Sequence, residues 1–243
     1  MGLPIQKAPT HRCKLNDGTE VKFRPFLVKE QKYLLIARES DNPVDIVNAV
    51  KNLISEVTDK QVDAEKLPMH DLEYLFLQIR AKSVGESVEV PVFCRNISCD
   101  GRGREAVDLT TVEVRTPDEE MSNDIKLNDT LGVTLRIPNA KQLAKADKEG
   151  ADETDKLINL LKIGIETIYD EETVYNADEI SDVELLNFVE SLTIAQVETI
   201  NKFFENAPYL AKDIDWTCKV CGTEQVTESV SYTHLTLPTK RIV

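Results

Sequence analysis

The spacing of apolar residues changes along the chain, and each spacing predicts a different kind of element. Apolar and polar residues alternate over 19–24, directly after the turn signal Asn16-Asp17-Gly18, which predicts a β-hairpin. Apolar residues then recur at helical spacing in three segments: 28–37, one that opens at 42–45 with Asn42 as its cap, and 69–82. Residues 1–86 are therefore expected to form an N-terminal hairpin and helices.

In the middle of the chain, apolar residues again recur at every second position. Alternation over 88–93 and 107–114 predicts two strands around a loop rich in cysteine and glycine. A further hairpin is predicted where 124–127 and 133–137 flank the turn signal at 128–132. Residues 87–138 are thus expected to be a β-rich knuckle region.

Residues 139–212 are predicted to be a helical region. A helix is expected over 152–169, with one apolar face made of Leu157, Leu160, Leu161, Ile165 and Ile168. Capping boxes at 181–184 and 193–196 predict the starts of two short helices. A strand over 214–217 and a second cysteine loop follow, so that residues 213–230 return to the β-rich region.

Composition narrows the possible functions. The chain has 243 residues, of which 41% are hydrophobic, and this is enough for a folded core. Its net charge of -14 repels phosphate backbones and anionic lipids, so we expect no nucleic acid partner. No stretch approaches the roughly 20 apolar residues that cross a bilayer, and no secretory signal opens the chain. We therefore expect a cytosolic protein without a membrane segment.

Two cysteine pairs are the main chemical feature of the sequence. Cys94 and Cys99 are separated by four residues and Cys218 and Cys221 by two, which are spacings found in structural zinc sites. Strand-like segments flank both pairs, as in a zinc ribbon. Four thiolates would fill the tetrahedral coordination of zinc, so the ion would be structural. The predicted fold class is α+β, with strand hairpins and a discontinuous zinc-ribbon-like module flanked by small helical bundles.

Two alternatives to a zinc site stay open for the cysteines. Cys218 and Cys221 could form a redox motif, although no strand-to-helix context opens at Cys218 and the other pair would be unexplained. Four metal-free, partly buried cysteines are the second alternative, because free cysteine packs as a small hydrophobe. Cys13 has no partner in the zinc interpretation.

No catalytic motif emerges from the sequence. His70, beside Asp71 at a helix start, is expected to be a surface or capping residue because no nucleophile context accompanies it. The acidic clusters at 118–120 and 170–172 lack the ligand spacing of a calcium loop and are expected to be solvated. We therefore expect that the chain is not an enzyme.

One segment of the chain resembles the opening of a baseplate hub protein family of T-even-type contractile-tailed bacteriophages. It is residues 21–37, Val-Lys-Phe-Arg-Pro-Phe-Leu-Val-Lys-Glu-Gln-Lys-Tyr-Leu-Leu-Ile-Ala. Later segments are similar in order: the first cysteine loop, 108–114, 124–127, 188–192, Phe203-Phe204 and Cys218-Lys-Val-Cys221-Gly222. The resemblance implies a structural or assembly component with other baseplate hub and tail proteins as partners. The implied locations are the host cytoplasm during assembly and the virion tail baseplate.

Two features depart from this resemblance. The first cysteine pair is spaced more widely than is usual, and residues 231–243 turn basic with no acidic residue. This end resembles translated sequencing-adapter read-through, so we interpret it as a non-native tail and leave it out of the fold prediction. The alternative function is a zinc-ribbon binding module of transcription or nucleic-acid machinery.

Overall fold

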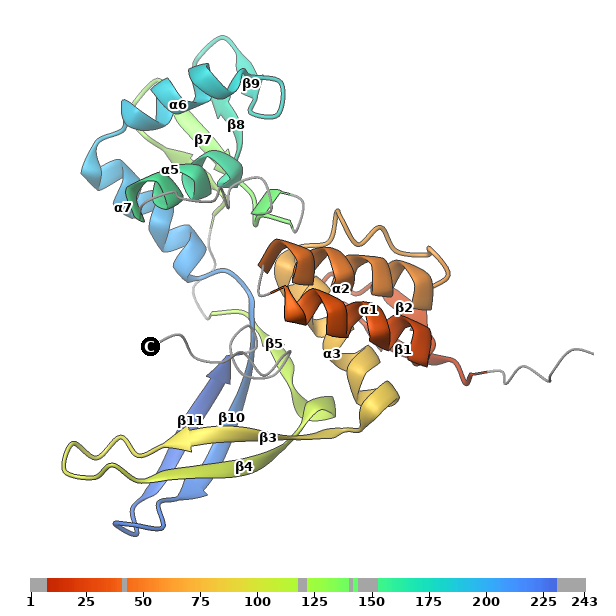
Figure 1. Cartoon of the computed structure of the whole chain (residues 1–243). Coiled ribbons are helices and arrows are strands. Elements are labelled where there is room, and N and C mark those ends of the chain that lie inside the picture. Colours follow the sequence, from red (N-terminus) through yellow and green to blue (C-terminus); the bar gives the residue numbers. More distant parts are fainter. Residues whose placement is uncertain (1–7, 41–42, 118–121, 140–141, 144–152, 231–243) are drawn as a thin grey trace, which may run out of the picture. The chain divides into compact units, whose positions relative to one another are not determined.

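A computed structural model of the protein describes residues 8–40, 43–117, 122–139, 142–143 and 153–230 (Figure 1). It shows a mixed α+β chain built from small sheets and helices. The helices are α1 (Val28–Glu39), α2 (Pro43–Val57), α3 (Met69–Val84), α5 (Glu153–Gly164), α6 (Asp182–Glu190) and α7 (Ile194–Glu205). The strands are β1 (His11–Lys14), β2 (Glu20–Phe23), β3 (Ser87–Phe93), β4 (Arg102–Asp108), β5 (Glu113–Arg115), β6 (Asp124–Lys126), β7 (Gly132–Leu135), β8 (Ile165–Tyr169), β9 (Val174–Asn176), β10 (Tyr209–Thr217) and β11 (Glu224–Val230).

The described residues fall into two compact units. The first lies within 1–64, 70–115 and 209–243, and the second within 65–69 and 116–208. The chain leaves the first unit after Arg115 and returns at Tyr209, and these two residues are paired in the antiparallel strands β5 and β10. Most of the second unit is therefore an insertion whose two ends are attached to neighbouring strands.

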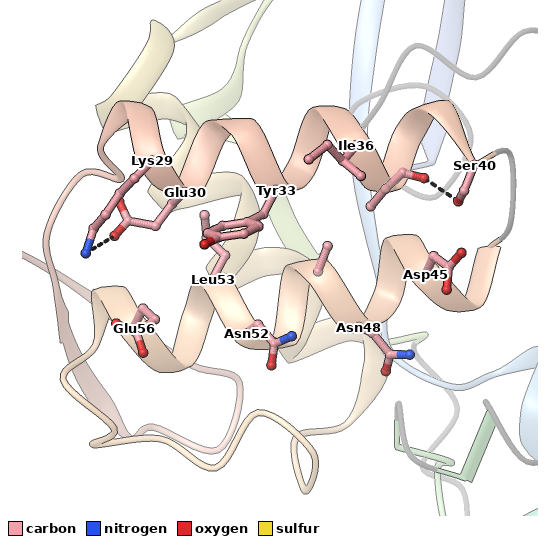
Figure 2. Close-up of a pocket in the computed structure, with 12 residues that line it drawn as sticks. Lys29, Glu30, Tyr33, Ile36, Ser40, Asp45, Asn48, Asn52, Leu53 and Glu56 are labelled. Carbon is pink, nitrogen blue, oxygen red and sulfur yellow. Dashed lines mark hydrogen bonds and ion pairs between the residues drawn. The ribbon is translucent and has the colours of Figure 1, made fainter.

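The first unit begins with the β1–β2 hairpin and the helices α1, α2 and α3. Helices α1 and α2 run antiparallel and side by side (Figure 2). Helix α3 is buried on most of its sides, which explains why its apolar residues do not form a single stripe. The carboxylate of Asp71 in α3 accepts the backbone N–H of Asn16 at 2.9 Å, so the hairpin turn is attached to this helix.

Strands complete the first unit. The β3–β4 hairpin is antiparallel, and β5, β10 and β11 form a three-stranded sheet in the order β11-β10-β5. Side chains from α3 and from both sheets share one core, made of Leu77, Ala81, Val90, Val92, Val107, Leu109, Val112, Leu210, Ile214, Trp216 and Cys218. The indole N–H of Trp216 donates to the hydroxyl of Thr227 at 2.9 Å, which satisfies its polar atom inside this core.

The second unit is a four-stranded sheet in the order β6-β7-β8-β9, packed with α5, α6 and α7. Its core consists of Val133, Leu135, Leu161, Ile165, Ile168, Ala177, Leu185, Val189, Ile200 and Phe203. The two predicted capping boxes are confirmed: Ser181 pairs with Glu184 at the start of α6, and Thr193 with Gln196 at the start of α7. Each box satisfies backbone donors that a helix leaves unpaired.

The helix predicted over 152–169 is wrong over residues 165–169, because the chain changes from helix to strand after Gly164. Ile165, Thr167 and Ile168 are β-branched and favour a strand, and β8 is paired on both sides by β7 and β9. The close packing of α7 also requires Gly164, since a Cβ there would lie 2.1 Å from the ring of Phe204. Tertiary pairing therefore overrides the helical spacing.

The strand predicted over 107–114 is also divided. A 3-10 turn at Leu109–Thr111 interrupts it, because the Asp108 carboxylate accepts the backbone N–H of Thr110 at 2.8 Å.

The other predicted hairpins and the strand over 214–217 are confirmed. The predicted cap Asn42 and the tail 231–243 lie outside the described residues. None of the helices that the structure describes has both the length and the apolarity of a membrane span.

Replacing Leu109 with Ala should lower the free energy of unfolding of the first unit by about 2–5 kcal/mol, because it leaves a cavity in the core that contains Trp216. Trp216 is the single tryptophan of the chain, so its fluorescence during urea unfolding reports on this core. Val226→Ala in β11 removes an exposed side chain and should change the free energy by less than about 0.5 kcal/mol. Equal shifts for the two variants would contradict the described core.

Candidate metal centre

The first cysteine loop joins β3 to β4. Cys94 follows the end of β3, and its backbone N–H donates to the carbonyl of Gly101 at 2.8 Å, which closes the loop. Within the loop, the backbone N–H of Cys99 donates to the carbonyl of Asn96 at 2.9 Å. These bonds direct both side chains toward the same side of the loop, where their sulfur atoms meet the second pair.

The second cysteine loop joins β10 to β11. The backbone N–H of Cys218 donates to the carbonyl of Thr223 at 3.0 Å, and the backbone N–H of Gly222 donates to the carbonyl of Cys218 at 2.8 Å. Gly222 has a φ of 72°, a conformation that side chains with a Cβ rarely adopt. The tight turn therefore depends on glycine at this position, and it brings Cys221 back toward Cys218.

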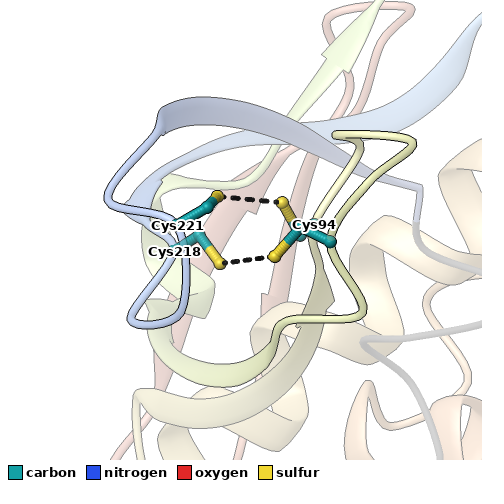
Figure 3. A group of neighbouring side chains, drawn as sticks. Cys94, Cys218 and Cys221 are labelled. Carbon is teal, nitrogen blue, oxygen red and sulfur yellow. Dashed lines mark hydrogen bonds between the residues drawn. The ribbon is translucent and has the colours of Figure 1, made fainter.

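The four sulfur atoms converge, and sulfur atoms from different loops contact each other (Figure 3). The Sγ atoms of Cys94 and Cys221 are 3.7 Å apart, as are those of Cys99 and Cys218. All four sulfur atoms lie within 4.8 Å of one another. These distances exceed a disulfide bond of about 2.05 Å, so the four residues are free thiols that share one site.

The arrangement fits a metal ion. In a regular tetrahedron with metal–sulfur bonds of about 2.3 Å, neighbouring sulfur atoms lie about 3.8 Å apart. The two 3.7 Å separations match this value, and the other four separations are at most 4.8 Å, so each needs to shorten by no more than about 1 Å. Cys218 is buried, whereas Cys94 and Cys99 are partly buried and Cys221 is exposed, so an ion could reach the site from the side of Cys221.

Two neighbours support the cysteines, and the sequence pattern indicated neither. The side chain of Gln225 joins the loops: its amide N–H donates to Cys94 Sγ at 2.8 Å, and its carbonyl oxygen accepts the backbone N–H of Arg95 at 2.9 Å. Gly101 is buried against the sulfur atoms, and a Cβ there would lie 2.3 Å from Cys218 Sγ. The only sequence signal for Gly101 is its position two residues after Cys99.

The thiols affect one another's ionisation. Hydrogen bonds with the hydroxyl and backbone N–H of Thr223 lower the pKa of Cys221 to about 6. The backbone N–H of Gly101 acts to lower the pKa of Cys99, but desolvation and hydrogen bonds with the other three sulfur atoms outweigh it and raise this pKa to about 12. One sulfur is thus readily ionised and another holds its proton. A bound cation would favour the thiolate form of all four.

The remaining candidates lie apart from this site. Cys13 is in β1, and burial, helped by the charge of Asp71, raises the pKa of its thiol to about 11. A surface position for His70 is wrong, because it is buried in α3 with its Nε2 3.8 Å from the carboxylate of Asp71. Burial lowers the pKa of His70, which favours the neutral ring.

Comparison with known proteins identifies the relationship. A family model described as T4 bacteriophage base plate protein matches residues 8–233. The chain belongs to this family. Membership supports a place in the tail baseplate of a phage, together with other tail proteins. No curated protein and no solved structure matches the chain.

Gly101→Ala should weaken metal binding strongly, because the added methyl group would occupy the space of the Cys218 sulfur. Titration with Co²⁺ measures this directly, since thiolate coordination gives a charge-transfer absorption. Ser98→Ala is the matched control, as Ser98 is exposed in the same loop and uses only its backbone N–H there. Binding by Gly101→Ala at wild-type affinity would contradict the described packing around the sulfur atoms.

Proposed function

We propose that this chain is a structural or assembly component of the hub in a contractile phage tail baseplate, acting through contacts with other hub and tail proteins. The observation that carries the proposal is the family match over residues 8–233, which includes both cysteine loops. A role in the host cytoplasm during assembly, followed by a place in the virion baseplate, is consistent with it. The proposal requires no catalytic step.

We further propose that zinc is the ion held by Cys94, Cys99, Cys218 and Cys221, and that it completes a zinc ribbon. Four sulfur ligands favour zinc among the common divalent cations. A tetrahedral site filled by four thiolates leaves no coordination position for a reactive water. The proposed ion is therefore structural. It would fix the ends of two hairpins beside the core to which Cys218 belongs.

The loops around the sulfur atoms also support a role in protein contacts. Ile97 in the first loop is fully exposed, and Val220 in the second is 74% exposed. Apolar side chains held in solvent by a rigid loop are suited to insertion into a partner surface. The metal would stabilise these loops without taking part in chemistry.

Nucleic-acid binding by the ribbon is the alternative. Arg95, Arg102 and Arg104 lie on or beside the first cysteine loop, which favours a phosphate contact. However, Arg104 is 3.5 Å from Glu89, Arg102 lies over the ring of Phe93, and the whole chain carries a net charge of -14. The nearby carboxylate of Glu89 and the negative net charge oppose binding to a phosphate backbone. We therefore favour protein partners.

Purified wild-type protein should contain one equivalent of zinc, and Cys218→Ser should reduce both the zinc content and the melting temperature. Removal of one of four ligands weakens the site and releases the link between the two hairpins. Elemental analysis by mass spectrometry measures the zinc. Cys13→Ser is the matched control, because Cys13 lies outside the cluster and its loss should leave zinc content unchanged. Equal zinc in wild type and Cys218→Ser would exclude the proposed ligand set.

Co-expression with the tail proteins of the same phage should yield a complex that contains this chain and remains associated during size-exclusion chromatography. Capsid proteins of that phage, expressed in the same way, serve as the negative control. Absence of any complex with hub or tail proteins would reject the hub assignment. Salt-dependent binding to duplex DNA or RNA in the same preparation would favour the alternative function.

A further inference from the structure

A groove of about 630 Å³ runs between α1 and α2 in the first unit (Figure 2). Its α1 wall includes Tyr33 and Ile36, and its α2 wall includes Asn48 and Asn52. The lining positions recur at spacings of three and four along both helices, so the groove follows the helix axes. The small residues Ala37 and Ala49 line its length, which allows the backbone of a bound segment to approach closely.

Helix α1 carries exposed apolar side chains both at the groove and outside its lining. Tyr33 is 66% exposed and Ile36 is 54% exposed, although isoleucine is among the residue types most often buried and tyrosine is intermediate. Val28 and Leu35 are exposed as well. A helix with apolar residues on both faces is typical of a helix that is covered on both faces in its assembled state.

The groove has an excess of negative charge. One lysine, Lys29, lines it together with the three carboxylates Glu30, Asp45 and Glu56. Glu30 is paired with Lys29 at 3.3 Å and with Arg24 at 3.1 Å, so its charge is already offset. Asp45 and Glu56 remain, near opposite ends of α2 and about 16 Å apart along its axis, and no ion pair of either occurs among the described residues.

We propose that the α1–α2 groove binds an amphipathic helix of a partner protein, with an apolar stripe facing Tyr33 and Ile36 and basic residues near Asp45 and Glu56. This inference rests on the proposed hub function and specifies the chemistry of one partner. A helix is the occupant that fits, because two antiparallel helices form a channel into which a third can pack side by side. The charges favour a basic helix over a second copy of this acidic chain.

The test is a fluorescence anisotropy titration of the full-length chain into two labelled designed peptides of three to four helical turns. Both peptides carry leucines at spacings of three and four, but one has lysines and the other glutamates on its flanks. The lysine peptide should bind at least about tenfold more tightly than the glutamate peptide. Equal binding, or no binding of the lysine peptide, would overturn the proposal.

Variants of exposed residues locate the binding site without disturbing the core. Tyr33→Ser combined with Ile36→Ser should weaken binding of the lysine peptide by about tenfold or more, whereas Val28→Ser, outside the groove lining, should bind as wild type. Wild-type affinity in the double variant would place the peptide elsewhere and reject the groove.

Charge variants separate steering by the groove from attraction to the acidic chain as a whole. Asp45→Asn with Glu56→Gln should remove the preference for the lysine peptide. Asp129→Asn with Glu198→Gln makes the same change in net charge at exposed positions of the second unit and should leave the preference intact. The same loss of preference in both double variants would overturn the assignment of the basic contacts to Asp45 and Glu56.

Sedimentation of the chain alone tests the competing occupant. A dimer that Tyr33→Ser with Ile36→Ser dissociates would show that a second copy fills the groove and would overturn the proposal. A monomer at the concentrations of the peptide titration is the expected result. Failure of peptide binding with intact co-purification of tail proteins would reject the groove alone, so the two proposals can fail separately.

Discussion

The convergence of two distant cysteine loops is the constraint on which the first unit depends. Cys94 and Cys221 are separated by 127 positions, and Cys99 and Cys218 by 119. Closing a loop of this length costs conformational entropy, but the cost rises only slowly with loop length. A metal ion with ligands from both loops would offset that cost at a single point. The long intervening segment is therefore compatible with the convergence of the two cysteine loops.

The pairing of β5 with β10 explains how the long segment between the two cysteine loops fits into the fold. Arg115 and Tyr209 are partners in this ladder, so the segment between them begins and ends at neighbouring positions. The Arg115 guanidinium also contacts Asp213 at 2.7 Å and Glu228 at 2.8 Å, which links β5 to both other strands of the sheet. An insertion with adjacent ends can fold around its own core without separating the cysteine loops.

The cysteine cluster could be predicted from sequence because its members are identified by residue type and spacing alone. The residues that support the cysteines could not be predicted in this way. Gln225 acts through a side-chain amide whose position depends on the register of β11, and Gly101 matters because of a sulfur more than a hundred residues away. Likewise, the apolar spacing of Leu161, Ile165 and Ile168 suits a helix, and only pairing with β7 and β9 makes the last two a strand. Local patterns identify candidates, whereas contacts distant in sequence decide among them.

The groove was not predictable either, because it depends on how little of α1 is used by its own unit. Glu30 is buried, and its carboxylate accepts hydrogen bonds from the Arg24 guanidinium and from the backbone N–H of Leu27. Burial acts to raise the pKa of Glu30, but these bonds outweigh it, so the pKa is lowered and the carboxylate stays ionised at neutral pH. Polar contacts at its first turn thus help to fix α1. Few apolar residues of α1 are buried within the first unit. Tyr33 and Ile36 therefore remain available for contact with another molecule.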